Sequence, residues 1–353
     1  MTYLVFSFKS GVGSAPVEPF TLKRVIANPE SPSGAGQMFG LTTSSQGDIV
    51  AIGAPAYGAV AQEGRVYTYD VTTGQLLNTF QGTAGADVQA SFGYSISLTP
   101  SYLVVGSPSA PEGTDNSSGR TYIFNKTTGE LLHTLTDPNI YGTTYNDAFA
   151  NNFVSVFGNY AVIGALGEQS STGDNDSGVV HVFDMVTGNK VRTIENPNVF
   201  GTPGGDSFGT SVFATADKIY VGAPSEETGL GKIYAFDFST GTLLHTFDDP
   251  NPYTGNAFDY FGYVPVAVFE NYLLATSPVE YSSDGQANNG RLYVFDTTTW
   301  ALVQTIDNPN DYGAKSDQFG MCISVSATHV AVGAVAEDDP SGISAGKVYI
   351  YGP

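Results

Sequence analysis

Short apolar runs separated by polar turns dominate the chain, and they recur with a long period. A Phe-Gly pair returns every 53 to 59 residues, with Phe149-Ala150 in one place. Each Phe-Gly is followed by four runs of four to six residues, three in the last copy, that are rich in β-branched and aromatic side chains, such as Arg291-Leu-Tyr-Val-Phe295. Such runs, bounded by Gly, Pro, Asn and Asp, predict short β-strands. The pattern therefore predicts six copies of a four-stranded unit. The pairs begin at Phe39, Phe92, Phe149, Phe208, Phe261 and Phe319.

The residue types between the third and fourth run of most copies indicate a tight hairpin turn. Asp70-Val-Thr-Thr-Gly74 recurs with Asp or Asn first and Gly last at three further places, 125–129, 184–188 and 237–241. The first side chain can accept a hydrogen bond within the turn, and Gly supplies the positive φ that closes a hairpin. The fifth copy has Trp300 in the Gly position, so we expect its turn to differ.

Six four-stranded units predict an all-β fold, a six-bladed β-propeller with four antiparallel strands per blade. The sixth copy ends after its third strand, at 347–351, while residues 21–29 match the fourth-strand pattern. We therefore expect an N-terminal outer strand to close the ring and cover the open edge. The predicted domains are an N-terminal arm, 1–19, and a single propeller, 20–353.

The repeated Phe-Gly and Gly-Ala-Pro-like segments resemble the FG-GAP repeats of integrin α-subunit heads. They are closer still to bacterial or phage-type FG-GAP repeats, and the resemblance covers about residues 20–353. Calcium-binding members carry an Asp-rich loop between the first and second strands. Here that connection is short and poor in acidic residues, as in Leu98-Thr-Pro-Ser-Tyr102. Because calcium needs six or more oxygen ligands, no metal site carries over. Asp174-Asn175-Asp176, in another loop, is read as a solvated turn, with calcium binding as the alternative.

Composition narrows the function classes. The formal net charge is −21, which repels phosphate backbones, so we expect no nucleic-acid partner. No apolar run approaches the roughly 20 residues that span a bilayer. The apolar start, Met1 to Phe8, lacks a preceding positive region, so we expect no cleaved signal peptide.

The sequence offers no distinctive candidate for a catalytic residue. The four histidines, His133, His181, His245 and His329, each occupy a position that the repeat fills elsewhere with another residue. No nucleophile elbow, phosphate loop or His-rich metal motif occurs. We therefore expect no enzyme and no cofactor.

The loops between blades carry the candidate partner-binding residues. Four of them start with Asn/Asp-Pro-Asn, followed by an aromatic residue and then by an Asp two positions before the Phe-Gly site. These residues are Tyr141, Phe200, Tyr253 and Tyr312, with Asp147, Asp206, Asp259 and Asp317. One interpretation is a binding surface for a protein or a surface glycan. The other is structural: the aromatics pack between blades and the Asp side chains cap turns. Unrepeated loop residues such as Glu226, Glu227 and Tyr281 are further candidates.

The resulting functional hypothesis is a non-enzymatic binding or structural propeller. We expect a virion appendage or capsid-associated protein, acting in assembly or host attachment and located on a virion or an extracellular surface. The alternatives are a bacterial surface adhesion or glycan-binding protein and a carbohydrate-active propeller enzyme. Residues 1–19 are expected either to dock on another chain, giving a homo- or hetero-assembly, or to fold back as an extra strand.

Overall fold

A computed structural model describes most of the chain. The described residues are 25–29, 38–55, 64–82, 91–111, 118–138, 147–171, 173–198, 204–251, 259–281, 288–309, 316–325, 329–337 and 346–352. They form two compact units, 1–136 and 137–353, which are treated separately. The predicted arm, 1–19, lies outside the described residues.

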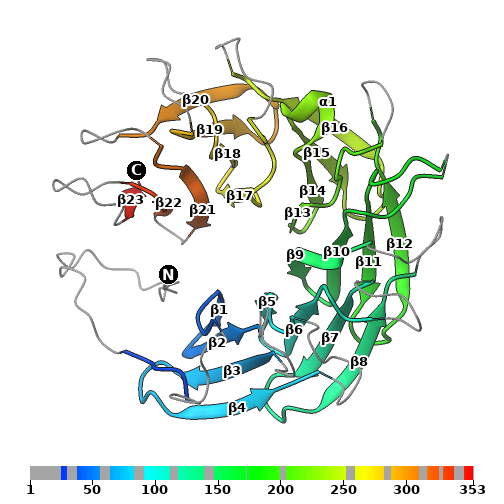
Figure 1. The fold of residues 1–353 in the computed structure, drawn as a ribbon, viewed down its shortest axis with the longest axis vertical. Coiled ribbons are helices and arrows are strands. Elements are labelled where there is room, and N and C mark those ends of the chain that lie inside the picture. Colours follow the sequence, from blue (N-terminus) through cyan, green and yellow to red (C-terminus); the bar gives the residue numbers. More distant parts are fainter. Residues whose placement is uncertain are drawn as a thin grey trace. The chain divides into compact units, whose positions relative to one another are not determined.

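Unit 1 contains two four-stranded antiparallel sheets, drawn in blue and cyan in Figure 1. In each sheet, neighbours in sequence are neighbours in space. The first sheet is β1 (Thr42–Gln46), β2 (Ile49–Ala54), β3 (Arg65–Asp70) and β4 (Leu76–Phe80). The second is β5 (Ser95–Leu98), β6 (Tyr102–Ser107), β7 (Arg120–Asn125) and β8 (Leu131–Thr136).

Unit 2 contains the sheets of copies three to six, built in the same order. The third is β9 (Phe149–Phe157), β10 (Tyr160–Ala165), β11 (Val179–Asp184) and β12 (Lys190–Glu195). The fourth is β13 (Ser211–Ala214), β14 (Lys218–Ala223), β15 (Lys232–Asp237) and β16 (Leu243–Asp248). A short helical turn, α1 (Glu226–Gly229), connects β14 to β15. The fifth is β17 (Ala267–Phe269), β18 (Tyr272–Ser277), β19 (Arg291–Asp296) and β20 (Leu302–Asp307). The sixth is β21 (Phe319–Val325), β22 (Val330–Ala334) and β23 (Lys347–Tyr351).

The predicted fold class is confirmed: the repeats form the blades of a six-bladed antiparallel β-propeller. Among the described residues, the sixth sheet has three strands. Residues 25–27 are not in a strand, and residues 21–24 lie outside the described residues. Closure by an N-terminal strand and the single domain over 20–353 therefore stay predictions.

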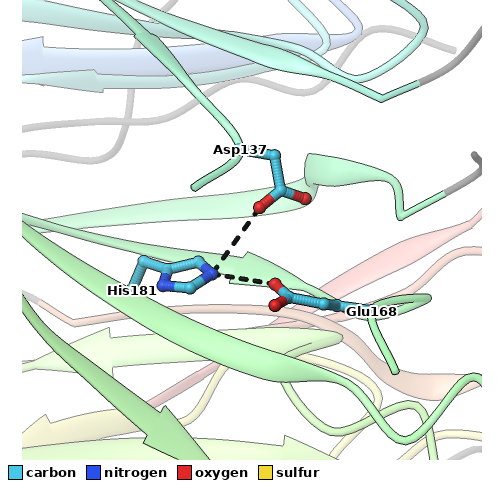
Figure 2. A group of neighbouring side chains, drawn as sticks. All are labelled: Asp137, Glu168 and His181. Atoms are coloured by element: carbon cyan, nitrogen blue, oxygen red, sulfur yellow. Dashed lines mark hydrogen bonds and ion pairs between the residues drawn. The ribbon is translucent and has the colours of Figure 1, made fainter. Parts of the chain in front are cut away.

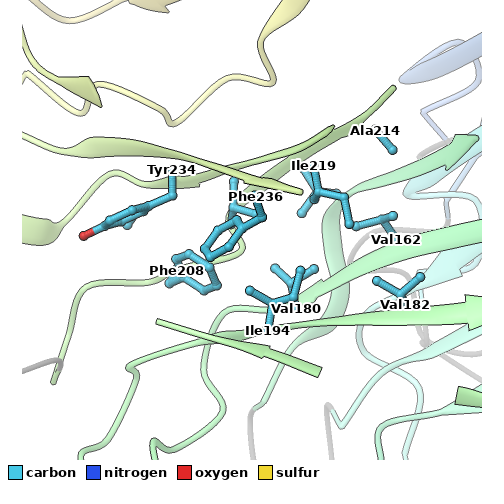
Figure 3. Close-up of a cluster of buried hydrophobic side chains, with 12 residues drawn as sticks. Val162, Val180, Val182, Ile194, Phe208, Ala214, Ile219, Tyr234 and Phe236 are labelled. Carbon is cyan, nitrogen blue, oxygen red and sulfur yellow. The ribbon is translucent and has the colours of Figure 1, made fainter. Parts of the chain in front are cut away.

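Packing of one blade on the next buries the core. Within unit 2, Val162, Val180 and Ile194 of the third sheet face residues of the fourth, as Figure 3 shows. Phe208, the aromatic residue of the fourth Phe-Gly pair, is fully buried there against Tyr234 and Phe236. Burying one such side chain contributes about 1.5–3 kcal/mol. The repeated Phe thus packs on the third strand of its own blade, within the core that the two neighbouring blades share.

Glycine is required where one blade meets the backbone of the next. At Gly178, which has φ +79°, a Cβ atom would lie 2.0 Å from the carbonyl oxygen of Phe208. The Phe208 amide donates to the carbonyl of the adjacent Ser177 at 3.1 Å. A side chain at Gly178 would therefore force the two blades apart. The same close approach, 2.0–2.2 Å to the carbonyl oxygen of the next repeated Phe, explains the glycines at 64, 231 and 290.

The turns after the third strands follow the predicted chemistry. Asp237 Oδ1, for example, accepts the amide of Thr240 at 2.7 Å. The expectation for Trp300 was wrong, because its turn is the same as the others. Trp300 has φ +64°, and its amide donates to the Asp296 carbonyl at 2.8 Å. Its ring stacks on His245 at 5.1 Å and 4°, which offsets the cost of a left-handed backbone.

Candidate ligand-binding pocket and buried junctions

The residue before each Phe-Gly pair adopts a left-handed backbone in all six copies. The φ values are 53° for Met38, 58° for Ser91, 54° for Ala148, 56° for Ser207, 53° for Tyr260 and 54° for Gln318. The carbonyl of each accepts the amide three residues later, as in Tyr263 to Tyr260 at 3.0 Å. None of the six is β-branched, as the crowding in this backbone region requires. We call this segment the Phe-Gly turn.

The Phe-Gly turns of unit 2 line a cavity of about 580 Å³. The segments that follow the second strands complete its wall. The Phe-Gly turns and the segments after the second strands therefore line the same cavity in unit 2. The lining residues are Asn151, Leu166, Ser207, Thr210, Pro224, Ser225, Tyr260, Tyr263, Pro278, Val279, Gln318 and Met321.

The chemistry of this pocket is uncharged. Asn151 and Gln318 contribute amides, Ser207 is one of three aliphatic hydroxyl residues, and two tyrosines contribute rings. Tyr263 is 41% exposed, so its ring is available to a ligand. Among the described residues that line the pocket there is no Asp, Glu, Lys, Arg or His.

The positions of the Phe-Gly turn that line the pocket differ between the copies. The first and fourth residues of the Phe-Gly turn are Ser207 and Thr210 in one copy and Tyr260 and Tyr263 in the next. The Phe between them is the same in both. The repeated Phe thus belongs to the blade, while the variable turn residues face the pocket together with the repeated Pro224 and Pro278, as expected of a binding site on a rigid scaffold.

Each copy of unit 2 has a buried glutamate shortly after its second strand. It stands three residues after the last residue of the second strand and is fully buried. The four are Glu168, Glu226, Glu280 and Glu337. In three copies a tyrosine of the third strand donates to it: Tyr234 to Glu226, Tyr293 to Glu280 and Tyr349 to Glu337, at 2.6–2.7 Å. In the third copy His181 takes this place. We call each glutamate with its partners a junction.

Burial raises the pKa of several junction carboxylates. In the fifth copy, burial and the nearby Asp249 charge raise the pKa of Glu280 to about 8. Burial also raises the pKa of Asp249 to about 7. In the fourth copy, burial raises the pKa of Glu226 to about 7. Arg291 donates to Glu280 at 2.7 Å, but one guanidinium cannot neutralise Asp249, Asp259 and Glu280 together. The fifth junction therefore retains a proton near neutral pH.

The predicted Asp residues belong to the same junctions. Asp147, Asp206, Asp259 and Asp317 are all buried. The side-chain amide of Asn196 donates to Asp206 at 2.9 Å, that of Asn251 to Asp259 at 2.7 Å and that of Asn308 to Asp317 at 2.7 Å. These bonds tie the start of each of these inter-blade loops to its end, and the capping of turns by the Asp side chains stays a prediction. Contact of the Asp residues with a partner stays a prediction.

The structure treats the remaining predicted site residues differently from one another. Tyr141, Phe200, Tyr253 and Tyr312 lie outside the described residues, so their role stays a prediction. Asp174 is held inside its own loop, where its amide donates to Ser170 Oγ at 3.0 Å. Glu226 is a repeated junction residue, which corrects its interpretation as an unrepeated loop residue. The repetition of this glutamate was missed, and Glu168, Glu280 and Glu337 were not predicted, although the constant spacing from the second strand was visible.

The comparisons with known proteins agree with the repeat architecture. Residues 309–351 match the family model of the FG-GAP repeat. A chain in the crystal structure of the mitotic checkpoint complex is similar with a TM-score of 0.56 and 13% identity, over 100% of this chain and 85% of that one. At this identity the likeness shows the fold alone. No curated protein matches.

The match over the sixth copy and the six blades together support an FG-GAP-repeat β-propeller. This class supports a binding or structural role in general. Among the described residues, no helix is both long and apolar enough to cross a membrane.

Proposed function

We propose that this protein is a non-catalytic recognition propeller that binds a neutral surface glycan in the pocket of unit 2. The observation that carries the proposal is the pocket wall, in which two tyrosines stand among amide and hydroxyl side chains. Aromatic rings pack on the apolar faces of sugars, while amides and hydroxyls fix the orientation of a polar ligand. A volume of about 580 Å³ lies within the range of small-ligand sites.

The same wall argues against sugar hydrolysis. Glycoside hydrolases use a pair of carboxylates beside the scissile bond. The described residues that line this pocket include no carboxylate, and the junction glutamates are fully buried. The protein therefore holds its ligand without cleaving it.

Attachment to a host surface is the biological role that we propose for this binding. A virion appendage would use such a rigid acidic propeller, with a formal charge of −21, to reach a glycan on a cell. An adhesion protein on a bacterial surface is the second candidate, because the same neutral pocket would serve it equally.

The test is a glycan array probed with the full chain, followed by isothermal titration with the best neutral oligosaccharide. Tyr263→Ser removes an exposed ring from the pocket and should weaken binding about tenfold or more. The matched control is Tyr272→Ser, because Tyr272 is similarly exposed, at 37%, but does not line the pocket.

The oligosaccharide recovered after long incubation should be chemically unchanged. A shortened product would overturn the non-catalytic assignment. Equal affinity of the Tyr263→Ser and Tyr272→Ser variants would place the binding elsewhere.

A further inference from the structure

The third junction departs from the repeat at two positions together. The residue after the repeat Gly is a cation in five copies, namely Arg65, Arg120, Lys232, Arg291 and Lys347, but it is Val179 in the third. Two residues later, five copies carry Tyr and the third carries His181. The third copy has thus exchanged its cation and its hydroxyl donor for an apolar residue and a metal-binding imidazole.

The three polar side chains of this junction converge on one point, as Figure 2 shows. His181 Nε2 lies 2.9 Å from Glu168 Oε2 and 3.7 Å from Asp137 Oδ1. One ligand atom from each residue lies within 4.8 Å of the other two. Ligand atoms about 2.1 Å from a shared tetrahedral ion are separated by roughly 3.4 Å, so small side-chain shifts would suffice.

The surroundings of the cluster exclude water. The side chains of His181, Asp137 and Glu168 are all 0% exposed. The rings of Phe149 and Phe183 lie 6.2 and 6.3 Å from the His181 ring. Excess charge in such an environment costs several kcal/mol.

The positive charge in this cluster can come from a proton on the imidazole or from a bound divalent cation, and the charge balance favours one of the two. A protonated imidazole beside two carboxylates leaves the cluster with one excess negative charge. A divalent cation with a neutral imidazole leaves one negative charge fewer than a protonated imidazole does, also when the buried Asp147 of this junction is counted, so it fits the dry site better.

The second nitrogen of the imidazole already has a hydrogen-bond partner that suits the metal-bound form. His181 Nδ1 lies 3.0 Å from Thr193 Oγ1. When Nε2 binds a cation, Nδ1 carries the proton and donates it to this hydroxyl. Metal-binding histidines are oriented by such a second hydrogen bond.

We infer that the third blade binds a divalent transition metal, with Zn²⁺ as the best-fitting ion, through Asp137, Glu168 and His181. Zn²⁺ takes imidazole nitrogen and carboxylate oxygen and accepts three protein ligands with a fourth exchangeable one. Ca²⁺ prefers six to eight oxygen ligands, so this set does not suit it. The site is structural and independent of the glycan pocket.

The test is elemental analysis of the tag-free full chain, expressed with added Zn²⁺ and dialysed. We expect about one Zn²⁺ per chain. The melting midpoint should fall by several degrees when a chelator removes the metal during refolding. With Co²⁺ in place of Zn²⁺, the visible absorption bands of a nitrogen-ligated ion should appear.

The decisive variant is His181→Tyr, which restores the residue of the other copies and should therefore fold. It should contain no Zn²⁺ and give a melting midpoint that chelator does not change. His133→Gln is the control, because Gln304 occupies the equivalent position of another copy; it should keep one Zn²⁺.

A metal-free wild type whose midpoint does not respond to Zn²⁺ would show that the cluster is only an ion pair of imidazolium and carboxylate. Full Zn²⁺ content in the His181→Tyr variant would likewise overturn the site.

Discussion

The third and fifth junctions occupy the same place in their blades, yet they neutralise a buried glutamate by different means. In the fifth, Glu280 contacts Arg291 and Tyr293. In the third, Glu168 contacts His181, and Val179 stands in the arginine position. The difference teaches that the blade backbone dictates where the carboxylate lies but leaves its counter-charge open. A repeat can therefore acquire a new site through two substitutions.

The largest effect in this comparison should come from removing the fifth-copy cation. Arg291 is 2% exposed and also donates to Asp307 at 2.6 Å. Arg291→Met keeps much of the volume but leaves Glu280 buried without its guanidinium, which should cost about 3–5 kcal/mol of unfolding free energy. Denaturant unfolding measures it. Lys347→Met should lose less, because that side chain is 36% exposed. A loss below about 1 kcal/mol for Arg291→Met would contradict a charge-dependent junction.

A smaller effect should follow from exchanging the hydroxyl donor. Tyr293→His removes two bonds to Glu280 and should cost about 1–3 kcal/mol. We expect no Zn²⁺ binding at this junction, because Arg291 already occupies the glutamate. Adding Arg291→Val to this variant gives the third-copy pair, and it should then bind Zn²⁺. Elemental analysis measures the Zn²⁺ content of both variants and so tests whether loss of the cation opens the site. A double variant that contains no Zn²⁺ would contradict this comparison.

The fifth junction should also make stability depend on pH. Burial raises the pKa of Glu280 to about 8 and that of Asp249 to about 7. The folded state thus binds protons more tightly than the unfolded chain, in which Glu and Asp have pKa values of about 4. The resulting stabilisation is full below about pH 4 and is lost as the pH rises through 7 to 8. We expect the melting midpoint to fall by a few degrees between pH 6 and 9.

Glu280→Gln should flatten that profile, because its amide does not titrate. Glu130→Gln, at an exposed turn position, should leave the slope unchanged. An equal slope in all three proteins would show that other groups control the pH dependence.

The smallest expected effect is that of calcium. The connections between first and second strands are short and ligand-poor, as in Phe157 to Tyr160. Melting in Ca²⁺ and in chelator selective for Ca²⁺ should give the same midpoint. A large calcium-dependent rise would mean that these connections, or the loop of Asp174, bind the ion after all.

Sequence periodicity was sufficient to predict the blades because the Phe-Gly pairs return every 53 to 59 residues and the Asp-to-Gly turns have a constant length. The junction glutamates escaped because the loops after them differ in length, so Glu168 and Glu226 stand ten and five residues before their repeat Gly. The pocket was not predicted for the opposite reason, since most of its lining residues lie at positions where the copies differ. The Trp300 turn was mispredicted because stacking on His245, a contact distant in sequence, outweighs the local strain.

The six left-handed positions before Phe have a consequence for protein engineering. Each imposes the same local conformation on Met38, Ser91, Ala148, Ser207, Tyr260 or Gln318, whatever the side chain. These positions can therefore carry different side chains on the same backbone. A combinatorial library that varies these six positions and the residue three further on, while omitting Val, Ile and Thr from the six positions, should yield folded proteins with many different binding specificities.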